Sequence, residues 1–203
     1  MASTKRNEKT MSKIFYLMGK SASGKDSIYK EIKEQIPELK TIVIYTTRPI
    51  RHGETDGVEY HFVDEVKLQE FQEAGKVIEL RAYNTVHGVW KYFTVNDGQF
   101  DADDNYLAIG TLESYRGMRE HLGEEKLVPI YIEVEDGDRL ERALKRERKQ
   151  EEPKYEELCR RFLADAADFS EEKLQEAGIT RKFLNEDKEK CVQEIVLGIR
   201  EKM

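Results

Sequence analysis

Residues 14–32 read IFYLMGKSASGKDSIYKEI and carry the strongest local signals in the chain. It opens with five apolar residues, which have the length and content of a buried strand, and then turns through glycine and serine. After the turn, Ile28, Tyr29 and Ile32 recur at the spacing of a helix. A strand, a glycine-rich turn and a helix in this order predict a loop whose backbone N–H groups surround an anion.

The turn carries the pattern G-x-x-x-x-G-K of a phosphate-binding loop. Lys25 would supply a positive charge for the β- and γ-phosphates of a nucleotide. The next residue is usually Ser or Thr, whose hydroxyl binds Mg²⁺, whereas this chain has Asp26. The alternative is a glycine-rich turn that binds nothing. The predicted ATP-binding residues of the loop are Gly19, Lys20, Ser21, Ala22, Ser23, Gly24, Lys25, Asp26 and Ser27.

Length and charge narrow the class of protein. The 203 residues fit one domain with small inserted lobes. Apolar residues make up 38% and charged residues 37%, and the net charge of −7 argues against a partner that is nucleic acid or an anionic membrane. Cys159 and Cys191 lack the spacing of metal ligands or of a disulfide framework, which favours a reducing compartment.

The N-terminal residues show no targeting signal. Residues 1–10 are followed by no apolar stretch of secretory length, so we expect a disordered leader and no signal peptide. No run of 18 apolar residues occurs that could span a membrane. These observations predict a cytoplasmic protein.

A second motif follows a predicted buried strand at residues 41–45. Residues 46–62 read TTRPIRHGETDGVEYHF, and their proline and glycines exclude a helix. Arg48 and Arg51 lie three apart on a stiffened loop, which suits two guanidinium groups that converge on one phosphate. Tyr60 could add a neutral donor. Ordinary solvated charge is the alternative for the two arginines.

The pattern T-T-R-x-x-R-x-G-E-x-x-G-x-x-Y-x-F resembles the nucleotide-monophosphate loop of the guanylate kinase family, and the resemblance extends over roughly residues 14–199. In that family the two arginines and the tyrosine grip the phosphate of GMP. The resemblance therefore assigns this role to Arg48, Arg51 and Tyr60. It also implies that Glu54 orients an arginine.

The resemblance also covers the site for the base. Glu79, in a predicted strand at residues 77–80, matches the glutamate that reads guanine, since one carboxylate can accept hydrogen bonds from N1–H and N2–H₂ together. Tyr92 and Thr94 match a turn where a tyrosine meets the phosphate and a hydroxyl meets the base. The segment before them, residues 84–91, is about two residues longer than the family pattern.

One departure concerns the next core strand, YLAIG at residues 106–110. In the family this strand carries two acidic residues that face the metal and the substrate, whereas Ala108 and Gly110 stand here. We hypothesise that Asp26 takes over the positioning of Mg²⁺.

A basic segment at residues 138–150 is predicted to be a helix and resembles the start of the family's lid. The resemblance places Arg142 beside the adenine of ATP and Arg146 at the transferring phosphoryl group. A second helix, at residues 155–169, carries Arg161, which matches another catalytic arginine. A strand at residues 128–134, helices at 25–35, 66–74 and 191–199, and a last strand at 182–186 with Asn185 against adenine complete the prediction.

We therefore expect an α/β P-loop NTPase three-layer fold with a parallel central sheet, an inserted GMP-binding lobe and a helical lid. The expected core comprises residues 11–45, 98–138 and 170–203, the GMP-binding lobe 46–97 and the lid 139–169. The resemblance implies a guanylate kinase, a monomer or homodimer that uses Mg²⁺ and transfers a phosphoryl group from ATP to GMP. Its predicted catalytic residues are Lys25, Arg146 and Arg161.

Two alternatives stay open. A kinase for another nucleoside monophosphate or small phosphorylated acceptor is favoured by Ile44, Tyr45 and Gly110, which replace residues on the base side. A non-catalytic binding module of guanylate kinase type is favoured by the missing acidic strand. The chain keeps Lys25 and both lid arginines, which a binding module does not need.

Overall fold

The computed structural model describes residues 12–85, 88–100 and 104–203. Within them the chain forms two β-sheets and seven α-helices. The leader expected at residues 1–10 lies outside the described residues.

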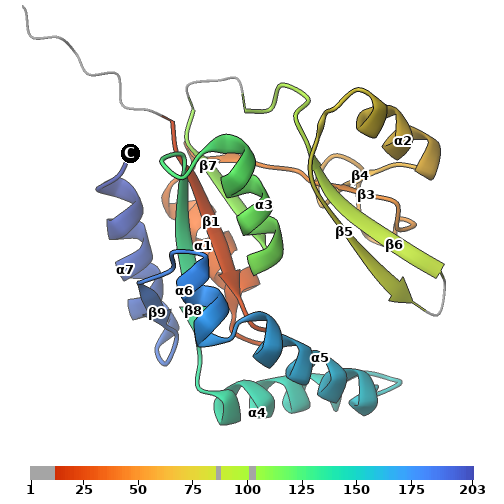
Figure 1. The fold of residues 1–203 in the computed structure, drawn as a ribbon. Helices are drawn as coiled ribbons and strands as arrows, with labels where there is room; N and C mark the ends of the chain where they lie inside the picture. Colours follow the sequence, from red (N-terminus) through yellow and green to blue (C-terminus); the bar gives the residue numbers. More distant parts are fainter. Residues whose placement is uncertain (1–11, 86–87, 101–103) are drawn as a thin grey trace, which may run out of the picture.

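A five-stranded parallel sheet forms the core (Figure 1). Its strand order is β2-β7-β1-β8-β9. The central strand β1 pairs with β7 on one side and with β8 on the other, and all its residues are buried. The predicted parallel sheet is confirmed. Its strands are β1 (Ile14–Gly19), β2 (Lys40–Thr41), β7 (Tyr106–Gly110), β8 (Leu127–Glu133) and β9 (Lys182–Leu184).

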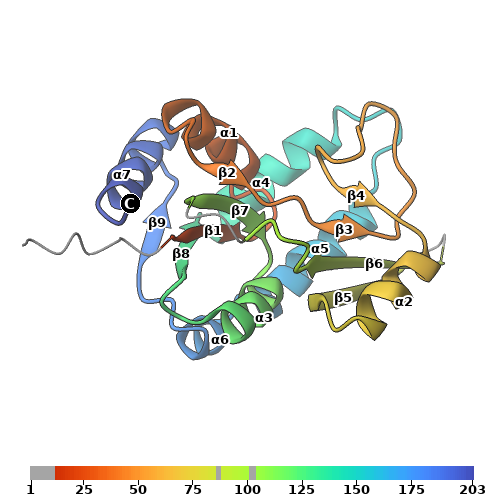
Figure 2. The ribbon, with the colours of Figure 1, turned by 90° about the horizontal axis from the view of Figure 1, so that it is seen from above.

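Helices cover both faces of this sheet (Figure 2). Because successive side chains of a strand point to opposite faces, Phe15 and Leu17 pack with α1 (Lys25–Gln35) and α7 (Lys188–Arg200). Tyr16 packs on the other face with α3 (Leu112–Leu122) and α6 (Glu171–Glu176). Burial on both faces explains why β1 is a continuous apolar run. The sequence does not predict α3 and α6, whose apolar residues are few among charged ones.

A second, four-stranded sheet has the order β4-β3-β6-β5 and packs against α2. Leu68, Phe93 and Val95 form its small core. In Figure 2 this sheet lies to one side of the parallel sheet. Its elements are β3 (Tyr45–Thr46), β4 (His61–Phe62), α2 (Glu65–Glu73), β5 (Val77–Thr85) and β6 (Gly88–Val95).

Two predictions about strands need correction. The single buried strand predicted at residues 41–45 is wrong, because β2 pairs with β7 in the core sheet and β3 pairs with β4 and β6 in the second sheet. The chain thus passes from one sheet to the other at residues 42–44. The strand predicted at residues 77–80 is too short, because β5 continues to Thr85 in an antiparallel pair with β6.

The two helices of the predicted lid are present. They are α4 (Asp136–Glu147) and α5 (Tyr155–Asp168), which pack against each other below the core sheet in Figure 1. The longest helix of the described residues, α5, has 14 residues, and no helix in that part of the chain has the length and apolar content needed to cross a bilayer.

Candidate active site

The loop between β1 and α1 has the backbone that an anion-binding loop requires. Gly24 has a φ of 86°, a left-handed conformation that favours glycine. A Cβ atom there would lie 2.6 Å from Nδ2 of Asn185, which donates a hydrogen bond to the Ser23 carbonyl at 2.7 Å. No side chain caps the N-terminus of α1. Asn185, assigned to adenine by resemblance, therefore fixes the shape of the loop.

A cleft of about 1170 Å³ runs from this loop to the second sheet. This volume exceeds that of most small-ligand pockets, which is about 300–1,000 Å³, so the cleft has room for more than one ligand. Several parts of the chain line it: Lys25 and Asp26 from α1; Arg51, Tyr60, Arg81, Tyr83 and Tyr92 from the second sheet and its loop; Ile109, Gly110 and Thr111 at the end of β7; and Lys154, Glu157 and Arg160 from the start of α5.

Arg48 and Arg51 differ in exposure. Arg48 is buried, and its Nη1 and Nη2 atoms donate hydrogen bonds to the two carboxylate oxygens of Glu54 at 3.0 and 2.8 Å. This hydrogen-bonded ion pair raises the pKa of Arg48 and lowers that of Glu54. Arg51 is exposed and lines the cleft. Glu54 thus orients an arginine, as the resemblance implies, and Arg51 is the arginine that reaches the cleft.

Three tyrosine rings lie together on the wall of the cleft. The ring centroid of Tyr92 is 5.6 Å from that of Tyr60 and 5.7 Å from that of Tyr83. Burial raises the pKa of Tyr60 and of Tyr83, so their hydroxyl groups stay neutral donors near pH 7. The structure therefore brings Tyr92 beside Tyr60, as the predicted phosphate site requires.

Glu79 and Thr94 also lie together, but they are buried and do not line the cleft. Oγ1 of Thr94 donates to Oε1 of Glu79 at 2.7 Å. Arg81 donates from Nε to Oε2 of Glu79 at 2.9 Å and from Nη2 to Oε1 at 3.3 Å. Arg81 lines the cleft, although the sequence motifs assign it no role. Its position two residues after Glu79, on the same face of a strand, was an available signal.

The end of β7 has no space for an acidic side chain. A Cβ atom on Gly110 would lie 2.1 Å from the Tyr16 hydroxyl and 2.8 Å from Oγ of Ser114. These two oxygens are hydrogen-bonded to each other at 2.5 Å. Burial raises the pKa of Tyr16 to about 12, which keeps it neutral. Tyr16 therefore fills the space that the second acid of the predicted family strand would need.

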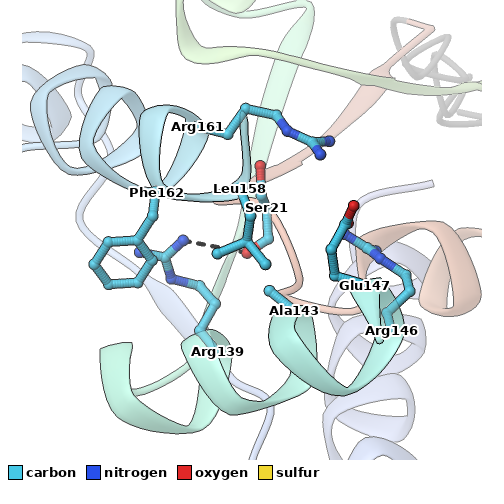
Figure 3. A pocket seen from close by; sticks show the side chains of 8 residues that line it. All are labelled: Ser21, Arg139, Ala143, Arg146, Glu147, Leu158, Arg161 and Phe162. Atoms are coloured by element: carbon cyan, nitrogen blue, oxygen red, sulfur yellow. Dashed lines mark hydrogen bonds between the residues drawn. The ribbon is translucent and has the colours of Figure 1, made fainter. Parts of the chain in front are cut away.

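The predicted lid arginines lie near the phosphate-binding loop. Arg146 of α4 and Arg161 of α5 line a gap of about 10 Å³ together with Ser21 (Figure 3). Nε of Arg161 is 3.4 Å from a carboxylate oxygen of Glu157. Nη2 of Arg142 donates to the carbonyl of Asn185 at 3.1 Å. Arg146 and Arg161 thus line a gap between the two helices, whereas Arg160 lines the large cleft.

A buried arginine ties the loop to both lid helices. Arg139 is 1% exposed, and its guanidinium carbon lies 4.2 Å from the ring centre of Phe162 (Figure 3). It donates to the carbonyl of Ser21 at 3.2 Å and to Asp165 at 3.3 Å. The same oxygen of Asp165 accepts from the Ser21 backbone N–H at 2.8 Å. The sequence did not assign these roles to Arg139 and Asp165.

Comparison with known proteins identifies the family. The family model described as guanylate kinase matches residues 11–175. The chain belongs to the guanylate kinase family. Two curated relatives are the guanylate kinases of Frankia casuarinae, 48% identical over 63 residues, and of Leifsonia xyli subsp. xyli, 32% identical over 118 residues. These matches cover 31% and 57% of this chain, and the chain spans only 34% and 45% of the two relatives.

Among solved structures, a guanylate kinase from Anaplasma phagocytophilum superposes with a TM-score of 0.64 and 24% identity, over 96% of this chain and 88% of that one. This likeness supports the fold. The chain therefore has the guanylate kinase fold. Within this fold Asp26 follows the loop lysine, Arg81 pairs with Glu79, and Tyr16 of β1 fills the space beside Gly110 at the end of β7.

Proposed function

We propose that the protein transfers the γ-phosphoryl group of ATP to the phosphate of GMP, which gives ADP and GDP. The observation that carries this proposal is that Lys25 of the phosphate-binding loop shares one cleft with Arg51, Tyr60 and Tyr92. Phosphoryl transfer needs a donor site and an acceptor site that open into the same space. Membership of the guanylate kinase family supports this assignment.

The roles of the residues follow from the demands of the reaction. Phosphoryl transfer requires two nucleotides in line and neutralisation of charge, with little covalent chemistry by the protein. Lys25 and the loop N–H groups would hold the β- and γ-phosphates. Arg51 would hold the acceptor phosphate, with the tyrosine hydroxyls as neutral donors. Arg146 and Arg161 would stabilise negative charge between the nucleotides after the lid closes.

The residues present fit a Mg²⁺ ion that binds with the nucleotide. Among residues 12–85, 88–100 and 104–203, no cluster of three or more His, Cys, Asp or Glu side chains could hold a metal alone. Mg²⁺ usually takes one or two carboxylates together with substrate phosphates. Asp26 is exposed, lies in the first turn of α1 and lines the cleft beside Lys25. Asp26 would hold the ion, which would neutralise phosphate charge when bound.

A coupled assay of ADP release tests the proposal. With ATP and Mg²⁺, we expect GMP and dGMP to be phosphorylated, and AMP, CMP and UMP to be poor acceptors. Lys25→Met should lower turnover by about a hundredfold or more, because charge stabilisation at the phosphates is lost. Lys30→Met is the matched control, since Lys30 is an exposed lysine on the same helix. Turnover of all five acceptors at background level would refute the proposal.

The same assay addresses the alternatives. A kinase for another phosphorylated acceptor is favoured by the hydrogen bonds that Glu79 makes to Arg81 and Thr94, since they occupy the carboxylate predicted to read guanine. That kinase would use a different monophosphate from the panel. A binding module would bind GMP without turnover.

We place the protein in the cytoplasm, which agrees with Cys159 and Cys191 as free thiols.

A further inference from the structure

We propose that Arg81 reads the acceptor base, through O6 and N7 of a 6-oxopurine, and that Glu79 acts by positioning Arg81. The proposal rests on the proposed function, because it places the acceptor nucleotide in the large cleft. It assigns specificity to a residue that the resemblance does not include.

The carboxylate of Glu79 is already engaged within the protein. One of its oxygens accepts from Thr94 and Arg81, and the other accepts from Arg81. Helix α3 passes directly over its side chain, because a Cβ atom on Gly117 would lie 2.7 Å from Cβ of Glu79. To accept N1–H and N2–H₂ of guanine, Glu79 would have to release Arg81. That release would leave a buried guanidinium without its counter-ion, which is costly.

Arg81 is placed to act on a ligand. It is 7% exposed and lines the cleft, whereas Glu79 lies behind it. A guanidinium has five N–H groups. Nε and Nη2 donate to Glu79, Nη1 makes a long contact of 3.4 Å to Oγ1 of Thr111, and the side chain also hydrogen-bonds to the neighbouring Tyr83. These contacts leave one of the five N–H groups without a partner, and the long Thr111 contact can be exchanged for a ligand, so the outer edge of the guanidinium can donate two hydrogen bonds to a ligand.

The surroundings of Arg81 suit a planar base. Ile44 and Ile109 line the same cleft and offer apolar surface. Arg81 also pairs directly with Tyr92 in the β5–β6 register, and Tyr92 is a predicted contact of the acceptor phosphate. A nucleotide held by its phosphate at Tyr92 would therefore extend its base along a wall that contains Arg81.

The chemistry of an arginine defines which base it can select. Two donors side by side match two adjacent acceptors, and in guanine these are O6 and N7. Adenine presents an amino donor in place of O6, so the guanidinium would oppose it. Hypoxanthine keeps both O6 and N7 and lacks only the 2-amino group. Arg81 should therefore favour the binding of GMP and IMP equally and disfavour the binding of AMP.

The test compares GMP, IMP, 7-deaza-GMP and AMP, by kcat/KM with ATP and Mg²⁺ and by equilibrium binding in calorimetry. The kcat/KM and affinity for IMP should stay within about threefold of those for GMP. The 7-deaza analogue lacks N7, so both values should be about tenfold lower or more, as expected for the loss of a hydrogen bond from a charged donor. If 7-deaza-GMP has the same kcat/KM and affinity as GMP while both values fall tenfold for IMP, the carboxylate reads the base and the proposal is overturned.

Variants assign the effect to Arg81. The double variant Glu79→Gln with Arg81→Gln keeps a hydrogen-bonding pair without buried charge and should bind GMP and 7-deaza-GMP equally. Arg116→Gln on α3 is the matched control, because Arg116 pairs with Glu176 outside the cleft, and it should keep the wild-type ratio. If the double variant binds all acceptors more weakly by the same factor, and the ratio of GMP to 7-deaza-GMP affinity is unchanged, Arg81 contacts the phosphate and the proposal is overturned.

The binding data separate the two hypotheses. If the predicted selectivity appears in binding but no acceptor is phosphorylated, the proposed function fails and the role of Arg81 stands. If GMP is phosphorylated but the ratio does not depend on Arg81, only the role of Arg81 fails. If no purine monophosphate binds, both are refuted.

Discussion

A Cβ atom on Gly110 would lie 2.1 Å from the hydroxyl oxygen of Tyr16. The side chains at these two positions are therefore coupled. A large residue at position 16 of β1 requires glycine at position 110 of β7, and an acid at position 110 would require a smaller residue at position 16. Tyr16 therefore occupies the volume that a side chain at position 110 would need, and no void is left beside Gly110.

Gly110→Ala should destabilise the protein by about 1–3 kcal/mol, as expected for overpacking of a filled interior. In the Tyr16→Phe background the added cost should be smaller, because the closest atom is gone although the ring remains. Urea unfolding of the two single variants and the double variant measures the coupling. Strictly additive free energies of unfolding would show that the two side chains do not compete for this space.

Asp26→Ala should lower turnover by about a hundredfold or more and raise the Mg²⁺ concentration required, since the hypothesis makes Asp26 the protein ligand of the ion. Asp26→Ser should stay impaired, because Ala108 offers no carboxylate behind the hydroxyl. Glu34→Ala, an exposed acid on the same helix, is the control. Magnesium titrations of initial rate provide the measurement, and wild-type dependence in Asp26→Ala would contradict the hypothesis.

Arg51→Ala should raise the KM for GMP by about tenfold or more, with the KM for ATP unchanged, because a charge-assisted bond to the acceptor phosphate is lost. Arg48→Ala should raise the same KM and also lower the melting temperature. Arg48 is buried against Glu54, whereas Arg51 is exposed. Steady-state kinetics and thermal unfolding distinguish the two. Equal melting temperatures would mean that the Arg48–Glu54 pair does not stabilise the loop.

Arg146→Ala and Arg161→Ala should each lower kcat by about a hundredfold, with modest changes in either KM, if they act on charge that develops during transfer. Arg148→Ala is the control, since Arg148 is an exposed arginine just after α4. Arg160→Ala should affect nucleotide binding instead, because Arg160 lines the large cleft. A rise in KM without a fall in kcat for Arg161→Ala would assign it to binding.

The sequence predicted the features with strong local signals. The apolar run, glycine turn and helical spacing of residues 14–32 correspond to β1, the loop and α1, with the bounds of α1 as predicted. It failed where long-range pairing decides the structure. Residues 41–45, TIVIY, have the composition of one buried strand, but their division between two sheets depends on β7 and β6, which lie far along the chain.

The same limit applies to the candidate site. Arg48, Glu54 and Tyr60 could be predicted because one short loop carries them in a distinctive pattern. The pairing of Arg81 with Glu79 and the contact of Asp165 with Ser21 depend on side-chain rotamers and on the meeting of distant segments. Sequence spacing alone shows that such residues share a face and leaves open which of them faces the ligand.

A substitution scan that measures activity alone would wrongly place Arg139 among the residues that contact the substrates. It contacts no part of the large cleft, yet it bonds to the carbonyl of Ser21, to Asp165 and to Asp136, and it stacks on Phe162. Replacing it would disturb the phosphate-binding loop and the packing of both lid helices at once. Substitutions at position 139 would then lower activity as strongly as substitutions in the cleft. Measuring the amount of folded protein together with activity is needed to show that Arg139 supports the structure.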